Sequence, residues 1–137
     1  MKTVGIIAEY NPFHKGHAYQ LRKAKELSGA DFAVIVMSGD FVQRGCPALT
    51  DKYLRAEMAL CSGADLVLEL PVSYATGSAE TFARGAVAVL EEFGCVDALC
   101  FGSETGDLDS LWRYASLFEE EPPLYRETLQ SYLKQGV

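Results

Sequence analysis

The chain has 137 residues, of which 49% are hydrophobic and 23% charged, and this composition is typical of a water-soluble folded domain. This length predicts a single domain, residues 1–137, with a core large enough to need neither disulfide bonds nor a structural metal. Because the chain has neither an apolar run of about 20 residues nor a signal-peptide pattern, we expect a cytoplasmic protein without membrane contact.

The charge of the chain, −7 in total, is distributed unevenly. Residues 1–60 carry eight basic and six acidic side chains, whereas residues 61–137 carry four basic and thirteen acidic ones. Bound phosphate is therefore expected in the first part, and the second part should repel a nucleic-acid backbone.

Apolar runs and helical spacing alternate along the chain. The apolar runs predict buried strands, and the spacing of apolar residues between them predicts helices. The predicted strands cover residues 3–8, 32–37, 66–70 and 97–101. The predicted helices cover residues 15–28, 51–61 with Thr50 as the N-cap, 79–94, 108–118 and 125–134. This alternation predicts an α/β fold, a Rossmann-like parallel sheet with helices on both faces. Because the chain stops shortly after the last helix, we expect it to be part of a longer protein.

The four cysteines do not have the spacing of a zinc module or a redox pair. Three of them lie in or beside apolar segments, and we expect reduced thiols in the core or near the surface. Cys46, which precedes a proline in a polar loop, is the one expected at the surface.

Polar and glycine-containing segments follow three of the predicted strands. They cover residues 9–17, 38–44 and 102–104. Ligands bind parallel α/β sheets at the carboxyl ends of the strands, so these segments are the candidate binding loops.

His14 and His17 are the only histidines of the chain, and they lie three residues apart at the start of a predicted helix. Gly16 between them would let a phosphate approach the backbone, and a helix N-terminus attracts anions. A phosphate-binding role is favoured for the pair. Two alternatives remain open: a zinc site whose third ligand is not apparent, and two surface histidines that cap the helix.

The first loop, with the sequence E-Y-N-P-F-H-K-G-H, resembles the H-x-G-H signature of the nucleotidyltransferase superfamily. Together with M-S-G-D-F-V-Q-R-G at 37–45 and F-G-S-E at 101–104, it is similar to the tRNA(Met) cytidine acetate ligase family of bacteria. The resemblance covers essentially the whole chain and implies a nucleotidyltransferase type of Rossmann-like fold.

This resemblance implies that ATP activates acetate as acetyl-adenylate, with Mg²⁺ assisting. The acetyl group then passes to N4 of the wobble cytidine of elongator tRNA(Met). It also implies that His14 and His17 are catalytic and that Gly102 contacts the nucleotide. Family proteins are longer than this chain, and we expect tRNA to bind mainly outside it. The segment expected to surround ATP comprises Gly5, Ile6, Ile7, Ala8, Glu9, Tyr10, Asn11, Pro12, Phe13, His14, Lys15, Gly16, His17 and Ala18.

Other loop residues have two interpretations each. Arg44, with Gln43 as a weaker candidate, could clamp a phosphate or carboxylate, or Arg44 could be a solvated charge or a partner of Asp40. Ser103 could bind the nucleotide or cap the following helix. Glu9 and Asn11 could position Mg²⁺ or ribose, or only fix the turn.

Two rival functions remain open at this point. The chain could be an adenylyltransferase that acts on a phosphorylated metabolite, although few basic residues are available for a second phosphate. Alternatively, it could be an inactive module that binds a nucleotide or presents tRNA. A purely structural domain would leave the three polar loops unexplained. Nothing in the sequence indicates an oligomeric state.

Overall fold

The computed structural model describes residues 1–136, and the chain divides into two compact units. The first unit, Met1–Phe101, contains a four-stranded sheet and its helices. The second unit begins at Gly102 and contains α5 (Leu108–Glu120) and α6 (Pro123–Lys134).

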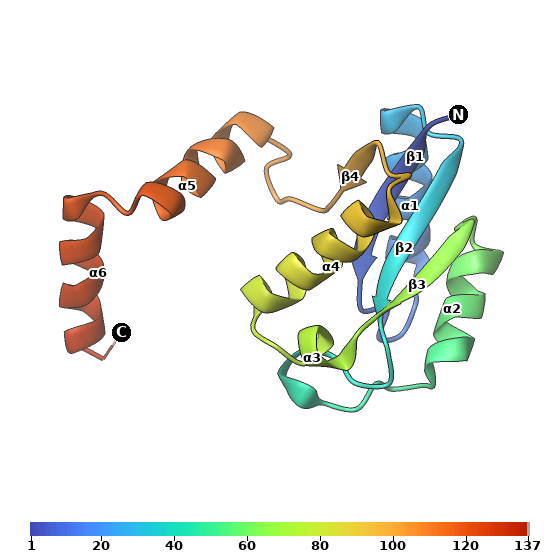
Figure 1. The fold of residues 1–137 in the computed structure, drawn as a ribbon, viewed down its shortest axis with the longest axis horizontal. Helices are drawn as coiled ribbons and strands as arrows, with labels where there is room; N and C mark the ends of the chain where they lie inside the picture. The colour runs from blue at the N-terminus through green and yellow to red at the C-terminus, as the bar shows by residue number, and fades with distance from the viewer. Residues whose placement is uncertain (137) are drawn as a thin grey trace. The chain divides into compact units, whose positions relative to one another are not determined.

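The sheet of the first unit is parallel and has the strand order β3-β2-β1-β4 (Figure 1). The prediction of a Rossmann-like parallel sheet with helices is therefore confirmed. Its strands are β1 (Thr3–Ala8), β2 (Phe32–Ser38), β3 (Leu66–Leu70) and β4 (Ala98–Cys100). Its helices are α1 (Lys15–Ser28), α2 (Lys52–Cys61), α3 (Val72–Ala75) and α4 (Ala79–Phe93), with a short 3-10 turn η1 (Gln43–Gly45).

Both faces of the sheet are covered by helices. On one face, α1 packs on β1 and β2 and α2 packs on β3, and the core between them includes Ile6, Ile35 and Leu21. On the other face, α4 covers the sheet, and its Phe82 side chain shares a core cluster with Val36 of β2 (Figure 1). A sheet buried on both faces requires nearly continuous apolar strands, which is the pattern that predicted them.

The start of α2 differs from its prediction by one residue. Asp51, rather than Thr50, is the N-cap, because its Oδ1 accepts hydrogen bonds from the amides of Tyr53 and Leu54, both at 3.0 Å. A carboxylate at this position also interacts favourably with the positive end of the helix. Thr50 Oγ1 is buried, and no partner for it is found in the described residues.

Other boundaries shift because local signals at element ends are weak. β4 is shorter than predicted, and Asp97, expected inside it, accepts a hydrogen bond from the amide of Thr3 at 2.7 Å. α6 begins at Pro123, which suits the first turn of a helix because proline lacks an amide hydrogen. The four-residue α3 and the turn η1 were not predicted, since neither is long enough to show helical periodicity.

All four cysteines are free, as predicted, and Cys46 is exposed. Cys61 and Cys95 are also exposed, whereas Cys100 is partly buried and packs against the core. Across residues 1–136, no helix combines the length and the apolar character needed to span a membrane.

Gly5 lies where β1 meets α4, and its position allows a testable prediction. A Cβ there would lie 2.8 Å from Leu90 Cδ1 and 3.0 Å from Val96 Cγ1. Gly5→Ala should therefore lower the free energy of unfolding by about 1–3 kcal/mol through overpacking. Gly102→Ala is the control in urea denaturation, because a Cβ at Gly102 would meet nothing within 4 Å. Equal stability of the two variants would contradict this packing role.

Candidate active site

The strand order locates the candidate site at the carboxyl end of β1. β2 and β3 follow β1 on one side of the sheet, whereas β4 pairs with β1 on the other side. The order of the strands thus reverses next to β1, and open α/β sheets bind ligands in the crevice at such a point. The segment from Glu9 to His17 leaves β1 at this end.

His14 and His17 cap the first turn of α1 reciprocally. His14 is the N-cap, and its Nδ1 accepts a hydrogen bond from the amide of Gly16 at 3.1 Å. His17 Nδ1 accepts one from the amide of His14 at 3.3 Å. The two imidazole rings stack, with centroids 3.7 Å apart and planes inclined by 22°. Capping boxes are usually formed by Ser or Thr with Glu or Gln, and here two imidazoles form one.

This cap determines which nitrogen of each ring carries the proton. A neutral imidazole has one acceptor nitrogen and one N–H donor. Because both Nδ1 atoms accept amide hydrogens, both protons lie on Nε2. Among the hydrogen bonds of residues 1–136, neither Nε2 has a protein partner. Two N–H donors are therefore available to a ligand at a helix N-terminus.

The ring of His17 packs against aromatic side chains. Its ring lies 4.8 Å from the Tyr10 ring and 5.6 Å from the Phe13 ring, measured between centroids. This partial burial lowers the pKa of His17, and the charge of His14 lowers it further. Tyr10 itself is buried and burial raises its pKa to about 12, so it remains an uncharged support under the imidazole.

Gly16 is required by the stacked histidines themselves. A Cβ at this position would lie 2.9 Å from Cε1 and 3.1 Å from Nδ1 of His14. Gly16 was predicted to allow close approach of a phosphate. The structure adds a second reason for glycine here, because a side chain would collide with the His14 ring.

The loop after β2 is tied to the segment after β1. The amide of Gln43 donates to Glu9 Oε1 at 2.9 Å, and the amide of Leu49 donates to Asn11 Oδ1 at 2.6 Å. Glu9 and Asn11 were expected either to position Mg²⁺ or ribose or to fix the turn. Both side chains make a hydrogen bond that fixes the turn. These bonds bring Gln43 to the candidate site.

Arg44, the other predicted clamp, is exposed and has a left-handed backbone with φ of 65°. Asp40 instead accepts a hydrogen bond from the amide of Lys52 at 3.1 Å. The described residues therefore show no ion pair between Arg44 and Asp40. Binding of a phosphate or carboxylate by Arg44 stays a prediction.

The remaining residues predicted to bind ATP lie in three places. Gly5, Ile6, Ile7 and Ala8 form the second half of β1. Pro12 lies in the turn that follows β1, and Lys15 and Ala18 lie in the first turn of α1. Gly102 and Ser103 follow β4 and belong to the second unit.

Ser103 does not cap α5. That helix is capped by Asp107, whose Oδ1 accepts from the amides of Asp109 and Ser110. Ser103 Oγ instead accepts from the amide of Gly106 at 3.3 Å. Its contact with a nucleotide stays a prediction.

Arg55 is a site residue that the sequence analysis missed. Its guanidinium is completely buried and donates to the backbone carbonyls of Glu9, Gly39 and Thr50. An arginine in the second turn of a helix has no local signal for such a role, because two of its partners lie 46 and 16 residues away in sequence.

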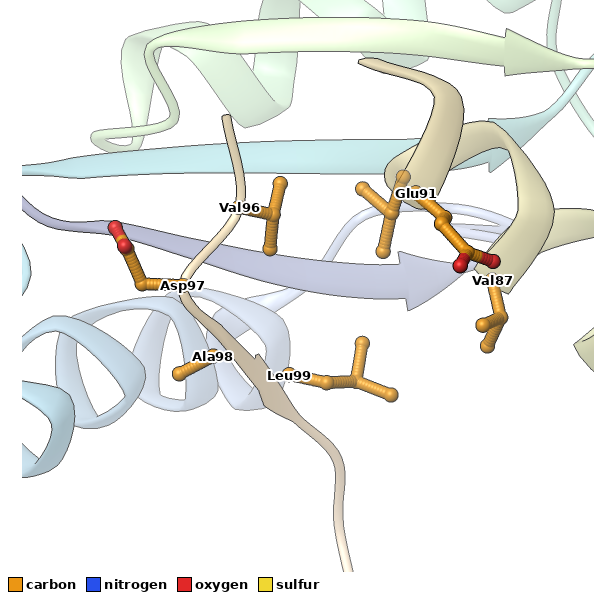
Figure 2. Close-up of a pocket in the computed structure, with 7 residues that line it drawn as sticks. Val87, Glu91, Val96, Asp97, Ala98 and Leu99 are labelled. Atoms are coloured by element: carbon orange, nitrogen blue, oxygen red, sulfur yellow. The ribbon is translucent and has the colours of Figure 1, made fainter. Parts of the chain in front are cut away.

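A cavity of about 370 Å³ between α4 and β4 does not suit a nucleoside triphosphate (Figure 2). The charged side chains that line it are the carboxylates of Glu91 and Asp97, which would repel phosphate. Asp97 contacts the first residue of β1, so this cavity begins at the amino ends of the strands. Its lining comprises Val87, Leu90, Glu91, Val96, Asp97, Ala98 and Leu99.

Comparison with known proteins identifies the family of this chain. Residues 1–137 match the model of the HIGH Nucleotidyl Transferase family. The chain belongs to this family.

Among its relatives is the tRNA(Met) cytidine acetate ligase of Thermoanaerobacter sp. (strain X514), 55% identical over all of this chain and 34% of that protein. The ligase of the same name from Acetivibrio thermocellus is 54% identical over all of this chain and 33% of its own length. The crystal structure of Thermotoga maritima TmcAL bound with alpha-thio ATP superposes with a TM-score of 0.91 at 50% identity, and it covers all of this chain and 33% of that one. The chain thus spans about a third of the length of the relatives it matches.

The histidine cap predicts a pH dependence of stability. Because the folded pKa of His17 lies below its ordinary value of about 6.5, the unfolded chain binds a proton there more readily. The contribution of neutral His17 to the free energy of unfolding is complete above a pH of about 6.5, and it is lost as the pH falls below that value. His17→Gln should preserve the cap, since Gln suits this position, and should not titrate.

Urea denaturation at pH 7.5 and 5.5 checks this expectation. The wild-type protein should lose more free energy of unfolding between these two pH values than His17→Gln does. The carboxylates titrate equally in both proteins and cancel in the comparison. An identical loss in both proteins would contradict the account of the cap.

Proposed function

We propose that this chain is the nucleotidyltransferase part of a tRNA(Met) cytidine acetate ligase. It binds ATP and acetate, forms acetyl-adenylate and releases pyrophosphate. The protein then transfers the acetyl group to N4 of the wobble cytidine of elongator tRNA(Met). The observation that carries this proposal is the reciprocal histidine cap, which presents two Nε2–H donors beyond the carboxyl end of β1. Family membership and the ATP analogue bound to the Thermotoga protein support it.

The first half-reaction needs no general base. A carboxylic acid of ordinary pKa is ionised at pH 7, so an oxygen of acetate can attack the α-phosphorus directly. A bond forms between this oxygen and phosphorus while the bond from phosphorus to pyrophosphate breaks. Negative charge accumulates on the phosphate oxygens and on the leaving group.

His14 and His17 would stabilise this charge as neutral hydrogen-bond donors. Their Nε2–H groups would donate to phosphate oxygens, while Nδ1 of each ring stays bound to the helix backbone. The positive end of α1 adds to the same field. Donors that are fixed before the reaction stabilise the transition state without reorganising.

In the second half-reaction, the N4 amine of the cytidine attacks the acetyl carbonyl. The bond between this carbon and the AMP oxygen breaks, AMP leaves, and the amine loses one proton to solvent. The acidic balance of residues 61–137 supports a tRNA surface that lies mainly outside this chain.

The other proposed contacts of ATP rest on the resemblance of these loops to the family's motifs. The segment from Gly5 to Ala18 would surround the nucleotide, and Gly102 and Ser103 would contact it after β4. Gln43, tied to Glu9, and Arg44 beside it would bind a phosphate or the acetate carboxylate.

Mg²⁺ would accompany ATP and neutralise part of the charge on pyrophosphate. Within residues 1–136, no three His, Cys, Asp or Glu side chains form a group that could hold a metal ion. The ion would then be held mainly by phosphate oxygens and water, as is common for Mg²⁺ with nucleotides.

Exchange of labelled pyrophosphate into ATP in the presence of acetate tests the proposal. In the protein at its full natural length, His14→Asn and His17→Gln retain a capping oxygen but lack the imidazole ring and its Nε2–H, since a shorter side-chain amide replaces it. Each should lower the exchange rate about 10²–10³-fold, because each removes one donor to the developing charge. Urea denaturation should show that both variants stay within about 1 kcal/mol of the wild type.

Leu27→Ala, an exposed position near the end of α1, is the matched control and should exchange normally. A histidine variant that keeps more than half of the exchange rate would remove that histidine from the mechanism. Exchange that requires an adenylylated metabolite instead of acetate would assign the protein to the metabolite adenylyltransferases. ATP binding without exchange would identify a nucleotide-binding module.

A further inference from the structure

Arg55 is the only fully buried charged side chain among residues 1–136. It lies on α2, outside the three loops that carry the predicted site residues. Burying a guanidinium is costly unless its N–H groups are paired, so its partners indicate what it stabilises.

All three nitrogens of the guanidinium donate to backbone carbonyls. Nη1 donates to Glu9 O at 2.7 Å, Nε donates to Thr50 O at 3.2 Å, and Nη2 donates to Gly39 O. Glu9 follows β1, Gly39 follows β2, and Thr50 precedes α2. A single side chain thus joins the exits of two neighbouring strands to the start of a helix.

The charges around Arg55 keep it ionised in this buried position. Burial lowers the pKa of Arg55, whereas the carboxylates of Asp40, Asp51, Glu9 and Glu69 raise it. Its direct partners are nevertheless neutral carbonyls, which offer fixed acceptors in three directions. Only a planar guanidinium can reach all three at once, because a lysine ammonium is a compact donor on a flexible stem.

Glu9 is held at two points, and this links Arg55 to the histidines. Its carbonyl accepts from Arg55, and its carboxylate accepts from the amide of Gln43. Only four residues separate Glu9 from the N-cap His14. Because this connecting segment is short, a displacement of Glu9 would also displace the first turn of α1.

We propose that Arg55 is a positioning residue for phosphoryl chemistry at this site. It fixes the exit of β1 against the exit of β2, and thereby aims the Nε2–H groups of His14 and His17 at the phosphates of ATP. This inference rests on the proposed function and adds to it a residue that touches neither substrate.

The test is a double-mutant cycle of Arg55→Lys and His17→Gln, measured as acetate-dependent pyrophosphate exchange in the protein at its full natural length. Misplacement of reacting groups by about 1 Å costs on the order of 10²-fold in rate. Arg55→Lys should accordingly lower kcat at least tenfold while KM for ATP changes less. In the His17→Gln background the same substitution should lower kcat by a smaller factor than in the wild type, because only the His14 donor is then left to be misplaced.

Ala59→Gly is the matched control, since it lies one turn further along α2, is buried and destabilises the same helix. It should lower the urea midpoint and leave kcat unchanged. If Arg55→Lys does not fold, Arg55→Gln provides a neutral side chain of similar reach for the same cycle.

Equal losses from Arg55→Lys in both backgrounds would show a general structural role and overturn the inference. Normal kcat in a folded Arg55 variant would overturn it as well, while leaving the proposed function intact. Absence of acetate-dependent exchange in the wild-type protein would instead overturn the proposed function, and this inference with it.

Discussion

Two hydrogen bonds in the first turn of α1 connect the fold of this protein to its proposed chemistry. The amides of Gly16 and His14 donate to Nδ1 of the two imidazoles, and these bonds begin the helix. The same bonds fix the tautomer of each ring and leave both Nε2–H groups to a ligand. Capping and phosphate binding, which are alternatives for the pair in the sequence, are therefore compatible roles of different nitrogens.

Further contacts hold this turn in place. The rings of Tyr10 and Phe13 support His17 from the protein side. Glu9 and Asn11 accept amides of the loop after β2, and Arg55 joins that loop, the exit of β1 and the start of α2. The side chains of Glu9, Asn11 and Arg55 are thus paired with backbone groups. Such pairing favours donors that are already positioned before ATP binds.

The sequence predicts those parts of the protein that depend on local pattern. The bounds of α1 follow from helical spacing, and the strands follow from apolar runs. Arg55 could not be predicted, because its role depends on carbonyls that only the folded chain brings together. Whether Asp51 or Thr50 caps α2 was equally undetermined, since both residues are good caps and the choice depends on how the loop enters the helix.

The central claim is that Nδ1 of both histidines binds the helix while Nε2–H binds phosphate. ¹⁵N NMR of the imidazole side chains, assigned with His14→Asn and His17→Gln, tests it directly during an ATP titration. The account predicts the Nε2–H tautomer for both residues without ATP, and a change at both Nε2 resonances with smaller changes at Nδ1 when ATP binds. An Nδ1–H tautomer in either ring, or unchanged Nε2 resonances in the ATP-saturated protein, would contradict it.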